Sequence, residues 1–323
     1  MNEEKILSGR GKLRKIAFLF PGQGSQYVGM GSSFYENFQI ARDVYNEAND
    51  ILGFDIAKLS FEGPAEKLTQ TNYTQPAILV HSFIGMRLLE NEGLSPHFAL
   101  GHSLGEYTSL IAGGVFDFST ALLLVKERGR LMHEVVPSDG GAMLALLGGK
   151  LEEAEKICND IEGVLEIANY NAPGQYVLSG ERKSVEQASF VAREAGFKKA
   201  VMLPVGAPFH CSLLVEASEK MSRVLESTEF RSSTIPLCAN VTGNLVSEAS
   251  EIKELLMKQM RVSVRWESSV SSLAGQNISA VIEVGPGKVL SGLNKRILKG
   301  LPVFNVEDKE SLESTLLELE GLE

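Results

Sequence analysis

Continuous apolar runs and segments with helical spacing alternate along much of the chain. Residues 16–20 (IAFLF) and 278–284 (ISAVIEV) are uninterrupted apolar runs, typical of strands buried on both faces of a parallel sheet. Residues 34–52 and 76–90 instead carry apolar side chains at helical spacing. Strands that alternate with helices predict an α/β fold with a parallel-rich sheet.

The pattern changes in the middle of the chain. Between residues 140 and 205, strand-like and helix-like runs follow one another in the order β-α-β-β-α-β, which is the order of a ferredoxin-like unit. Segments rich in proline and glycine flank it. We therefore predict a ferredoxin-like small domain at 138–205, inserted into a larger catalytic domain made of 15–137 and 206–323.

Charge and composition narrow the classes of partner. The formal net charge of −10 argues against non-specific binding to nucleic acid. The three cysteines lie far apart and indicate neither a zinc site nor a disulfide framework, which fits a reducing cytoplasm. Residues 1–14 lack the apolar core of a secretory signal, so we expect a flexible extension there. No stretch is long and apolar enough to predict a bilayer span, so we expect a cytoplasmic protein without a membrane partner.

The pentapeptide Gly-His-Ser-Leu-Gly at 101–105 lies between a short apolar strand and an apolar helix. In that context Gly-x-Ser-x-Gly predicts a nucleophile elbow, where glycines keep Cβ atoms out of a crowded turn. Helix N–H groups behind the turn are aimed at a developing oxyanion. The alternative is a chance match in a glycine-rich chain. The strand–turn–helix context favours Ser103 as the nucleophile.

One arginine of the predicted helix at 119–136 points with its apolar stripe. Arg128 has Leu124, Val125, Leu131 and Met132 at helical spacing, whereas Lys126 and Arg130 share faces with polar neighbours. A buried guanidinium needs an anion to offset its desolvation. Either Arg128 forms a structural salt bridge with an internal acid, or its planar fork binds a substrate carboxylate.

His210 is the best placed of the five histidines for acid–base work. It follows a proline-rich loop and opens a predicted helix, and such junctions often carry catalytic groups. The positive end of that helix would keep the ring neutral, as a general base requires. A structural role is the alternative for a lone histidine.

Two glycine-rich segments resemble phosphate-binding loops but fail the required spacing. Tyr27 stands where the dinucleotide fingerprint needs glycine, and Val289 replaces the hydroxyl residue of a P-loop in GPGKV. The loop after the first strand can still present N–H groups beside the elbow.

Several motifs together resemble the malonyl-CoA:acyl carrier protein transacylase family. They are FPGQGSQ (20–26), TQPA (74–77), GHSLGEY (101–107), RGRLM (128–132), NAPGQ (171–175), PFH (208–210), VRW (264–266) and EVGPGKVL (283–290). Each is weak alone, but their order and spacing are specific, and the resemblance runs from residue 15 to about residue 299. The resemblance implies an α/β-hydrolase-like large domain with a ferredoxin-like insertion.

The family also implies roles for particular residues. Ser103 would be the nucleophile, His210 its base and Arg128 the partner of the malonyl carboxylate. The backbone N–H groups of Gln23 and Leu104 would form the oxyanion hole.

Three further positions complete the expected site. Gln75 would line the same pocket, and the backbone carbonyl of Arg265 would orient His210 in place of an acid. Some members carry Gln in place of Arg265, so its side chain is given no role. Phe209 stands where some members carry Ser, and an aromatic there accompanies selection of malonyl over methylmalonyl groups.

The resemblance implies transfer of a malonyl group from malonyl-CoA to the phosphopantetheine thiol of acyl carrier protein, in fatty-acid biosynthesis. No metal and no tightly held cofactor is expected, and we expect a monomer. A serine hydrolase or an acyltransferase for uncharged groups is the enzymatic alternative, against which Arg128 argues. A non-catalytic module that binds the carrier is a further alternative. Basic residues Lys295, Arg296 and Lys299, or Lys198 and Lys199, are candidates for docking an acidic carrier protein.

Overall fold

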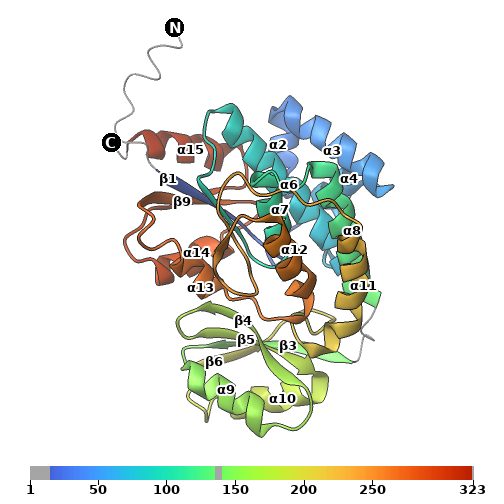
Figure 1. Cartoon of the computed structure of the whole chain (residues 1–323), viewed down its shortest axis with the longest axis vertical. Coiled ribbons are helices and arrows are strands. Elements are labelled where there is room, and N and C mark those ends of the chain that lie inside the picture. Colours follow the sequence, from blue (N-terminus) through green and yellow to red (C-terminus); the bar gives the residue numbers. More distant parts are fainter. Residues whose placement is uncertain (1–14, 135–139, 322–323) are drawn as a thin grey trace.

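The computed structural model describes residues 15–134 and 140–321 (Figure 1). Its larger sheet has the order β10-β9-β1-β2-β7-β8, and every pair in it is parallel except β7 with β8. The strands are β1 (Lys15–Phe20), β2 (Phe98–Gly101), β7 (Leu237–Cys238), β8 (Leu245–Val246), β9 (Ile278–Val284) and β10 (Val303–Val306). The predicted parallel-rich sheet is confirmed.

Strand β1 lies in the middle of this sheet and is buried on both faces. Phe18 and Phe20 join one hydrophobic cluster with residues of the helices between β1 and β2, while Ala17 and Leu19 join a second cluster on the opposite face. Alternate side chains of a strand point to opposite faces, so an uninterrupted apolar run is what this position requires.

Helices cover both faces of the large sheet. Figure 1 shows α13 and α14 on one side of the large domain and α3, α4, α8 and α11 on the other. Their bounds are α2 (Ser32–Asn37), α3 (Gln39–Leu52), α4 (Ile56–Glu62), α5 (Ala65–Leu68), α6 (Thr71–Asn91), α7 (Gly105–Ala112), α8 (Phe118–Glu134), α11 (Val215–Glu226), α12 (Ala249–Lys258), α13 (Trp266–Ser271), α14 (Val289–Ile297) and α15 (Lys309–Glu320). Two 3₁₀ turns, η1 (Ser212–Leu214) and η2 (Gln259–Arg261), precede α11 and follow α12.

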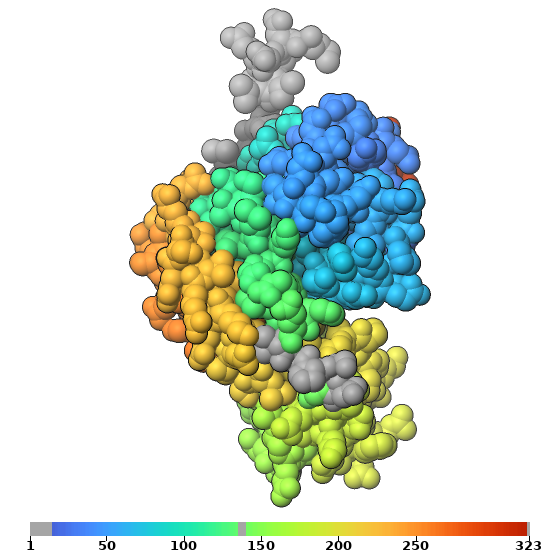
Figure 2. All heavy atoms as spheres, turned by 90° about the vertical axis from the view of Figure 1, so that its right-hand side faces the viewer, coloured from blue at the N-terminus to red at the C-terminus, as the bar shows by residue number. Residues whose placement is uncertain are grey.

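Residues 141–202 form the lower lobe in Figures 1 and 2, and they contain a separate antiparallel sheet. Its order is β4-β5-β3-β6, which for a β-α-β-β-α-β chain is ferredoxin-like. The elements are β3 (Gly141–Leu147), α9 (Leu151–Asp160), β4 (Leu165–Ala172), β5 (Gln175–Glu181), α10 (Arg182–Val191) and β6 (Lys199–Met202). Leu144 and Leu146 pack in a cluster with residues of α9 and α10, whereas Met143 and Val177 belong to the core cluster of the large domain. One face of the small sheet is thus covered by α9 and α10, and its other face packs on the large domain.

The predicted fold class is confirmed, with differences at element ends. The helix predicted at 34–52 is divided in two at Phe38, whose backbone is extended. The helix predicted at 119–136 is observed as α8, and Asp117 caps it by accepting a hydrogen bond from the Thr120 N–H at 2.7 Å. The extension at 1–14 and the domain limit at 137–138 lie outside the described residues. Among the helices that are described, none is long and apolar enough to cross a membrane.

Candidate active site

Ser103 lies in the turn between β2 and α7, and its φ of 52° is in the left-handed region. The turn is too tight for side chains on its flanks. A Cβ on Gly101 would lie 1.9 Å from the carbonyl carbon of Gly105, and one on Gly105 would lie 2.0 Å from the oxygen of Phe20. The predicted elbow is therefore present, and its glycines are required sterically.

The Ser103 hydroxyl contacts His210, as expected for a nucleophile and its base. Ser103 Oγ lies 2.7 Å from His210 Nε2. On the other side of the ring, Nδ1 lies 2.9 Å from the carbonyl oxygen of Gln259 and 3.2 Å from that of Val262. Carbonyls only accept, so Nδ1 carries the proton and Nε2 is free to accept from Ser103. His210 also has a positive φ, 57°, and strained backbone of this kind concentrates at functional sites.

The prediction that the Arg265 carbonyl orients His210 is wrong. Arg265 is the N-cap of α13, and its carbonyl accepts from the Ser269 N–H and hydroxyl, each at 2.9 Å. That carbonyl is used in the first turn of the helix. The carbonyls that meet His210 come instead from the 3₁₀ turn η2 and the residue after it, where no helix continues to use them.

Burial and charge keep His210 neutral. The loss of hydration and, after it, the Arg128 charge together lower the pKa of His210 to about 3, although the Gln259 carbonyl partly opposes both. The prediction that His210 opens a helix is wrong: the residue lies in a turn, η1 begins only at Ser212 and α11 at Val215. A ring that is neutral at pH 7 has the protonation state that a general base needs.

Arg128 is fully buried and reaches the nucleophile. Its NH2 group donates to Ser103 Oγ at 3.1 Å and to Gln259 Oε1 at 3.0 Å, and NH1 donates to Gln75 Oε1 at 2.6 Å. Over the described ranges Arg128 has no carboxylate within salt-bridge distance. The structural salt bridge considered above is therefore not observed, and the cation is held by uncharged oxygens.

The glycine-rich loop after β1 packs against the elbow. A Cβ on Gly22 would lie 2.5 Å from the carbonyl oxygen of His102, and the His102 N–H donates to Phe20 at 3.0 Å. Within the part of the chain that the structure describes, the N–H groups of Gln23 and Leu104 donate no hydrogen bond. Both are thus free to donate, and their role in an oxyanion hole stays a prediction.

Of the remaining predicted residues, Gln75 contacts the site directly and Phe209 adjoins it along the chain. Gln75 is buried and holds Arg128, while its Nε2 lies 3.3 Å from Met132 Sδ. Phe209 directly precedes His210, and its side chain is buried in the large core.

Three polar residues that the sequence interpretation missed complete the network. Asn240 accepts from the Ser103 N–H at 2.6 Å and donates to the Gly101 carbonyl at 2.6 Å, which fastens both sides of the turn. The Gln259 side chain donates to the Ser103 carbonyl at 2.8 Å and to the carboxylate of Glu106 at 2.8 Å. Glu106 falls within the GHSLGEY motif, and its position on an apolar helix could have identified it as a buried carboxylate. Asn240 and Gln259 stand in no motif.

Asn171, the first residue of the NAPGQ motif, contacts the elbow from the small domain. Its Oδ1 lies 2.9 Å from His102 Nε2, and the His102 ring lies 5.5 Å from that of Trp266. Strand β4 of the small domain is thereby joined to the residue before the nucleophile.

The basic residues proposed for docking are only partly available. Arg296 donates to Gln175 Oε1 and to the Pro173 carbonyl, both at 2.7 Å, so it is engaged with the small domain. Helix α14 ends at Ile297, so Lys299 lies beyond the helix that carries Lys295 and Arg296. Both lysines are exposed.

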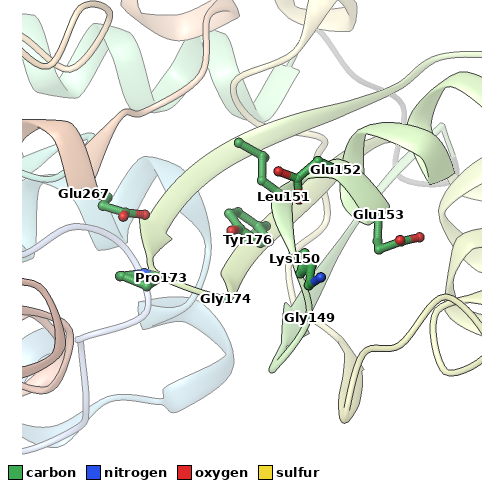
Figure 3. Close-up of a pocket in the computed structure, with 9 residues that line it drawn as sticks. All are labelled: Gly149, Lys150, Leu151, Glu152, Glu153, Pro173, Gly174, Tyr176 and Glu267. Atoms are coloured by element: carbon green, nitrogen blue, oxygen red, sulfur yellow. The ribbon is translucent and has the colours of Figure 1, made fainter.

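An open groove of about 690 Å³ is lined by none of the predicted catalytic or substrate-binding residues (Figure 3). Glu267 from α13 lines one side, and Lys150, Glu152 and Glu153 near the start of α9 line another. The charged residues of its lining are mostly acidic, which does not suit the phosphates of a nucleotide. No cluster of three metal-ligating side chains occurs among the described residues.

Comparisons with known proteins agree with this geometry. Residues 17–313 match the acyl transferase domain family. The malonyl CoA-acyl carrier protein transacylase of Bacillus subtilis (strain 168) is 42% identical over 304 residues, 93% of this chain and 96% of that protein.

Solved structures give the same result. An acyl carrier protein S-malonyltransferase from Vibrio cholerae has a TM-score of 0.89 at 41% identity, covering 93% of this chain and 99% of the other. A malonyl-transacylase solved in complex with its type II PKS acyl-carrier protein has a TM-score of 0.91 at 38% identity, covering 94% and 99%. The resemblance drawn from the sequence motifs is confirmed: this chain belongs to the acyl transferase domain family and, within it, to the malonyl CoA-acyl carrier protein transacylases.

Proposed function

We propose that this protein transfers a malonyl group from malonyl-CoA to the phosphopantetheine thiol of an acyl carrier protein, through a malonyl ester on Ser103. The observation that carries the proposal is a buried arginine with no carboxylate partner among the described residues, whose NH2 group lies 3.1 Å from the nucleophile. In a malonyl ester one methylene group separates the carboxylate from the carbonyl, so an anion attached to Ser103 lies within reach of Arg128.

In the first half-reaction, Ser103 Oγ attacks the thioester carbonyl while its proton passes to His210 Nε2. The N–H groups of Gln23 and Leu104 stabilise the oxyanion that forms. The intermediate then expels coenzyme A, which leaves as a thiol after taking the proton from His210. The contacts of Nδ1 with the carbonyls of Gln259 and Val262 hold the ring in place throughout.

In the second half-reaction the carrier thiol gives its proton to His210 and attacks the malonyl ester, and Ser103 recovers its hydroxyl proton. Water must be excluded from the ester, or hydrolysis would compete. No step requires a metal or a bound cofactor.

Arg128 also separates this function from its rivals. An acyltransferase for uncharged groups, or a serine hydrolase, would leave the buried guanidinium without an anion in every state of the cycle. A non-catalytic module would not need a hydroxyl placed 2.7 Å from a neutral histidine. We further propose a cytoplasmic monomer that serves fatty-acid biosynthesis.

The test is transfer between two purified partners. The protein, malonyl-CoA and a phosphopantetheinylated acyl carrier protein are mixed, and the carrier is weighed by mass spectrometry. We expect the carrier to gain one malonyl group at a rate proportional to enzyme concentration. A carrier without its phosphopantetheine is the matched control and should gain nothing. A malonylation rate equal to that without enzyme would contradict the proposal.

A further inference from the structure

A buried carboxylate lies behind the active site and takes part in none of the steps described above. Glu106, in the first turn of α7, is 6% exposed. Its Oε2 accepts from Gln259 Nε2 at 2.8 Å, and its Oε1 accepts from the Asn240 N–H at 3.4 Å. It forms no hydrogen bond with His210, so it is not the acid of a catalytic triad.

The side-chain amide of Gln259 stands between this carboxylate and Arg128. The two hydrogens of Nε2 are used by Glu106 and by the Ser103 carbonyl, both at 2.8 Å. Its Oε1 accepts from Arg128 Nε at 3.3 Å and NH2 at 3.0 Å. A guanidinium only donates and an ionised carboxylate only accepts, so the amide has one permitted orientation.

This orientation determines what Arg128 meets. If the amide were reversed, its NH2 group would face the guanidinium and leave donors opposed in a buried site, which is costly. A carboxylate in direct contact with Arg128 would hold the guanidinium but would also compensate its charge. A substrate carboxylate would then have to displace that internal carboxylate. With an amide between them, the arginine is held by uncharged oxygens and keeps its charge.

The ionisation of Glu106 is coupled to the same groups. Burial raises the pKa of Glu106 to about 7, while its hydrogen bonds from Gln259 and Asn240 and the Arg128 charge oppose that rise. Breaking the network therefore alters the charge of the site as well as its geometry.

We propose that Glu106 is a positioning residue for malonyl selection: acting through the Gln259 amide, it holds the Arg128 guanidinium beside Ser103 without neutralising it. This inference rests on the proposed malonyl transfer and concerns the selectivity of its first half-reaction. Glu106 touches neither the hydroxyl of Ser103 nor any reacting atom.

The first test is Glu106→Gln, with rate constants for Ser103 acylation measured separately with malonyl-CoA and acetyl-CoA by intact-protein mass. The glutamine side chain has about the same shape but offers one acceptor where two donors arrive, from Gln259 and Asn240. We expect the malonyl-to-acetyl ratio to fall about tenfold, mostly through a higher KM for malonyl-CoA, since a charge-assisted contact is misplaced. A fall by the same factor for both substrates would overturn the inference.

The second variant, Gln259→Glu, leaves Glu106 in place and sets a carboxylate against Arg128. The backbone carbonyl that orients His210 is retained. We expect the malonyl-to-acetyl ratio to fall further than in Glu106→Gln, because the new carboxylate competes with the substrate. The combination of both substitutions keeps the original charge but should not restore the ratio. An unchanged ratio in Gln259→Glu, or full restoration in the combination, would overturn the inference.

Glu127→Gln is the matched control. Glu127 is an acid paired with Arg130 on α8, so its removal changes the net charge equally without touching the network. Its ratio should equal that of the wild type. If the wild type itself takes up no malonyl group, the proposed function fails. If the wild type is malonylated and both variants keep its ratio, only the role of Glu106 fails.

Discussion

Replacing Arg128 by alanine tests the basis of substrate selection most sharply. The substitution removes hydrogen bonds to Gln75, Gln259 and Ser103. The first two are made whichever acyl group arrives, so their loss slows malonyl and acetyl transfer alike. Only the NH2 nitrogen of the guanidinium faces Ser103, and the proposed reaction places the malonyl carboxylate there. The ratio of the two rates therefore isolates the contact with the substrate.

The size of the effect follows from the strength of charged hydrogen bonds. Each is worth roughly 1.5–3 kcal/mol, and an arginine can make two with one carboxylate. The loss of the pair should cost about 3 kcal/mol of transition-state binding, which is a factor of about a hundred in the malonyl-to-acetyl ratio. The absolute rate for acetyl should fall less, because the cavity and the unpaired amide oxygens disturb the site only indirectly.

The assay compares kcat/KM for malonyl-CoA and acetyl-CoA in wild type, Arg128→Ala and Arg130→Ala. Arg130 lies two residues from Arg128 on α8, is exposed, and pairs with Glu127 and Glu134. Exposed ion pairs contribute little, so Arg130→Ala should keep the wild-type ratio. If Arg128→Ala lowers both substrates by equal factors, Arg128 is structural and does not bind the malonyl carboxylate.

Three further outcomes are expected. Phe209→Ser should improve methylmalonyl transfer relative to malonyl by roughly tenfold, since one methyl group in a tight apolar pocket costs about 1–3 kcal/mol; an unchanged ratio would remove Phe209 from selection. Burial lowers the pKa of His81 from 6.5 to about 4, so the neutral ring contributes stability that is present above pH 6.5 and lost as pH falls toward 4. Over that window the free energy of unfolding of the wild type should fall about 3 kcal/mol more than that of His81→Gln, measured by urea unfolding; parallel pH profiles would refute this. Exchanging Lys295 and Lys299 together for Glu should raise the KM for the carrier protein several-fold and leave acylation by malonyl-CoA intact, whereas an unaltered KM would move the docking surface elsewhere.

Local signals made the nucleophile and its fold predictable. The elbow at Ser103 needs glycines on both sides of one turn, and that requirement is legible in five consecutive residues. Arg128 was identifiable because helical spacing places it on an apolar face, where a buried charge needs a polar or charged partner. The β-α-β-β-α-β order of the small domain likewise follows from the pattern of runs along the chain.

The supporting residues could not be found in this way. Asn240 and Gln259 meet Ser103 across 137 and 156 residues of chain, and both stand in segments without a motif. The role given to Arg265 failed because a carbonyl's availability depends on where a helix begins: α13 uses the Arg265 carbonyl, while the end of η2 leaves the Gln259 carbonyl free. The two carbonyls, of Gln259 and Arg265, are six residues apart, and the sequence pattern cannot tell which of them meets His210.

The central claim is that Ser103, activated by His210, carries the malonyl group between two thiols. The most direct measurement is the intact mass of the protein after brief incubation with malonyl-CoA, followed by peptide mapping. The wild type should gain one malonyl group on the peptide that contains Ser103 and lose it when a phosphopantetheinylated carrier is added. Ser103→Ala should gain none. A malonyl group that remains covalently attached to Ser103→Ala, or an adduct that the carrier cannot discharge, would contradict the account.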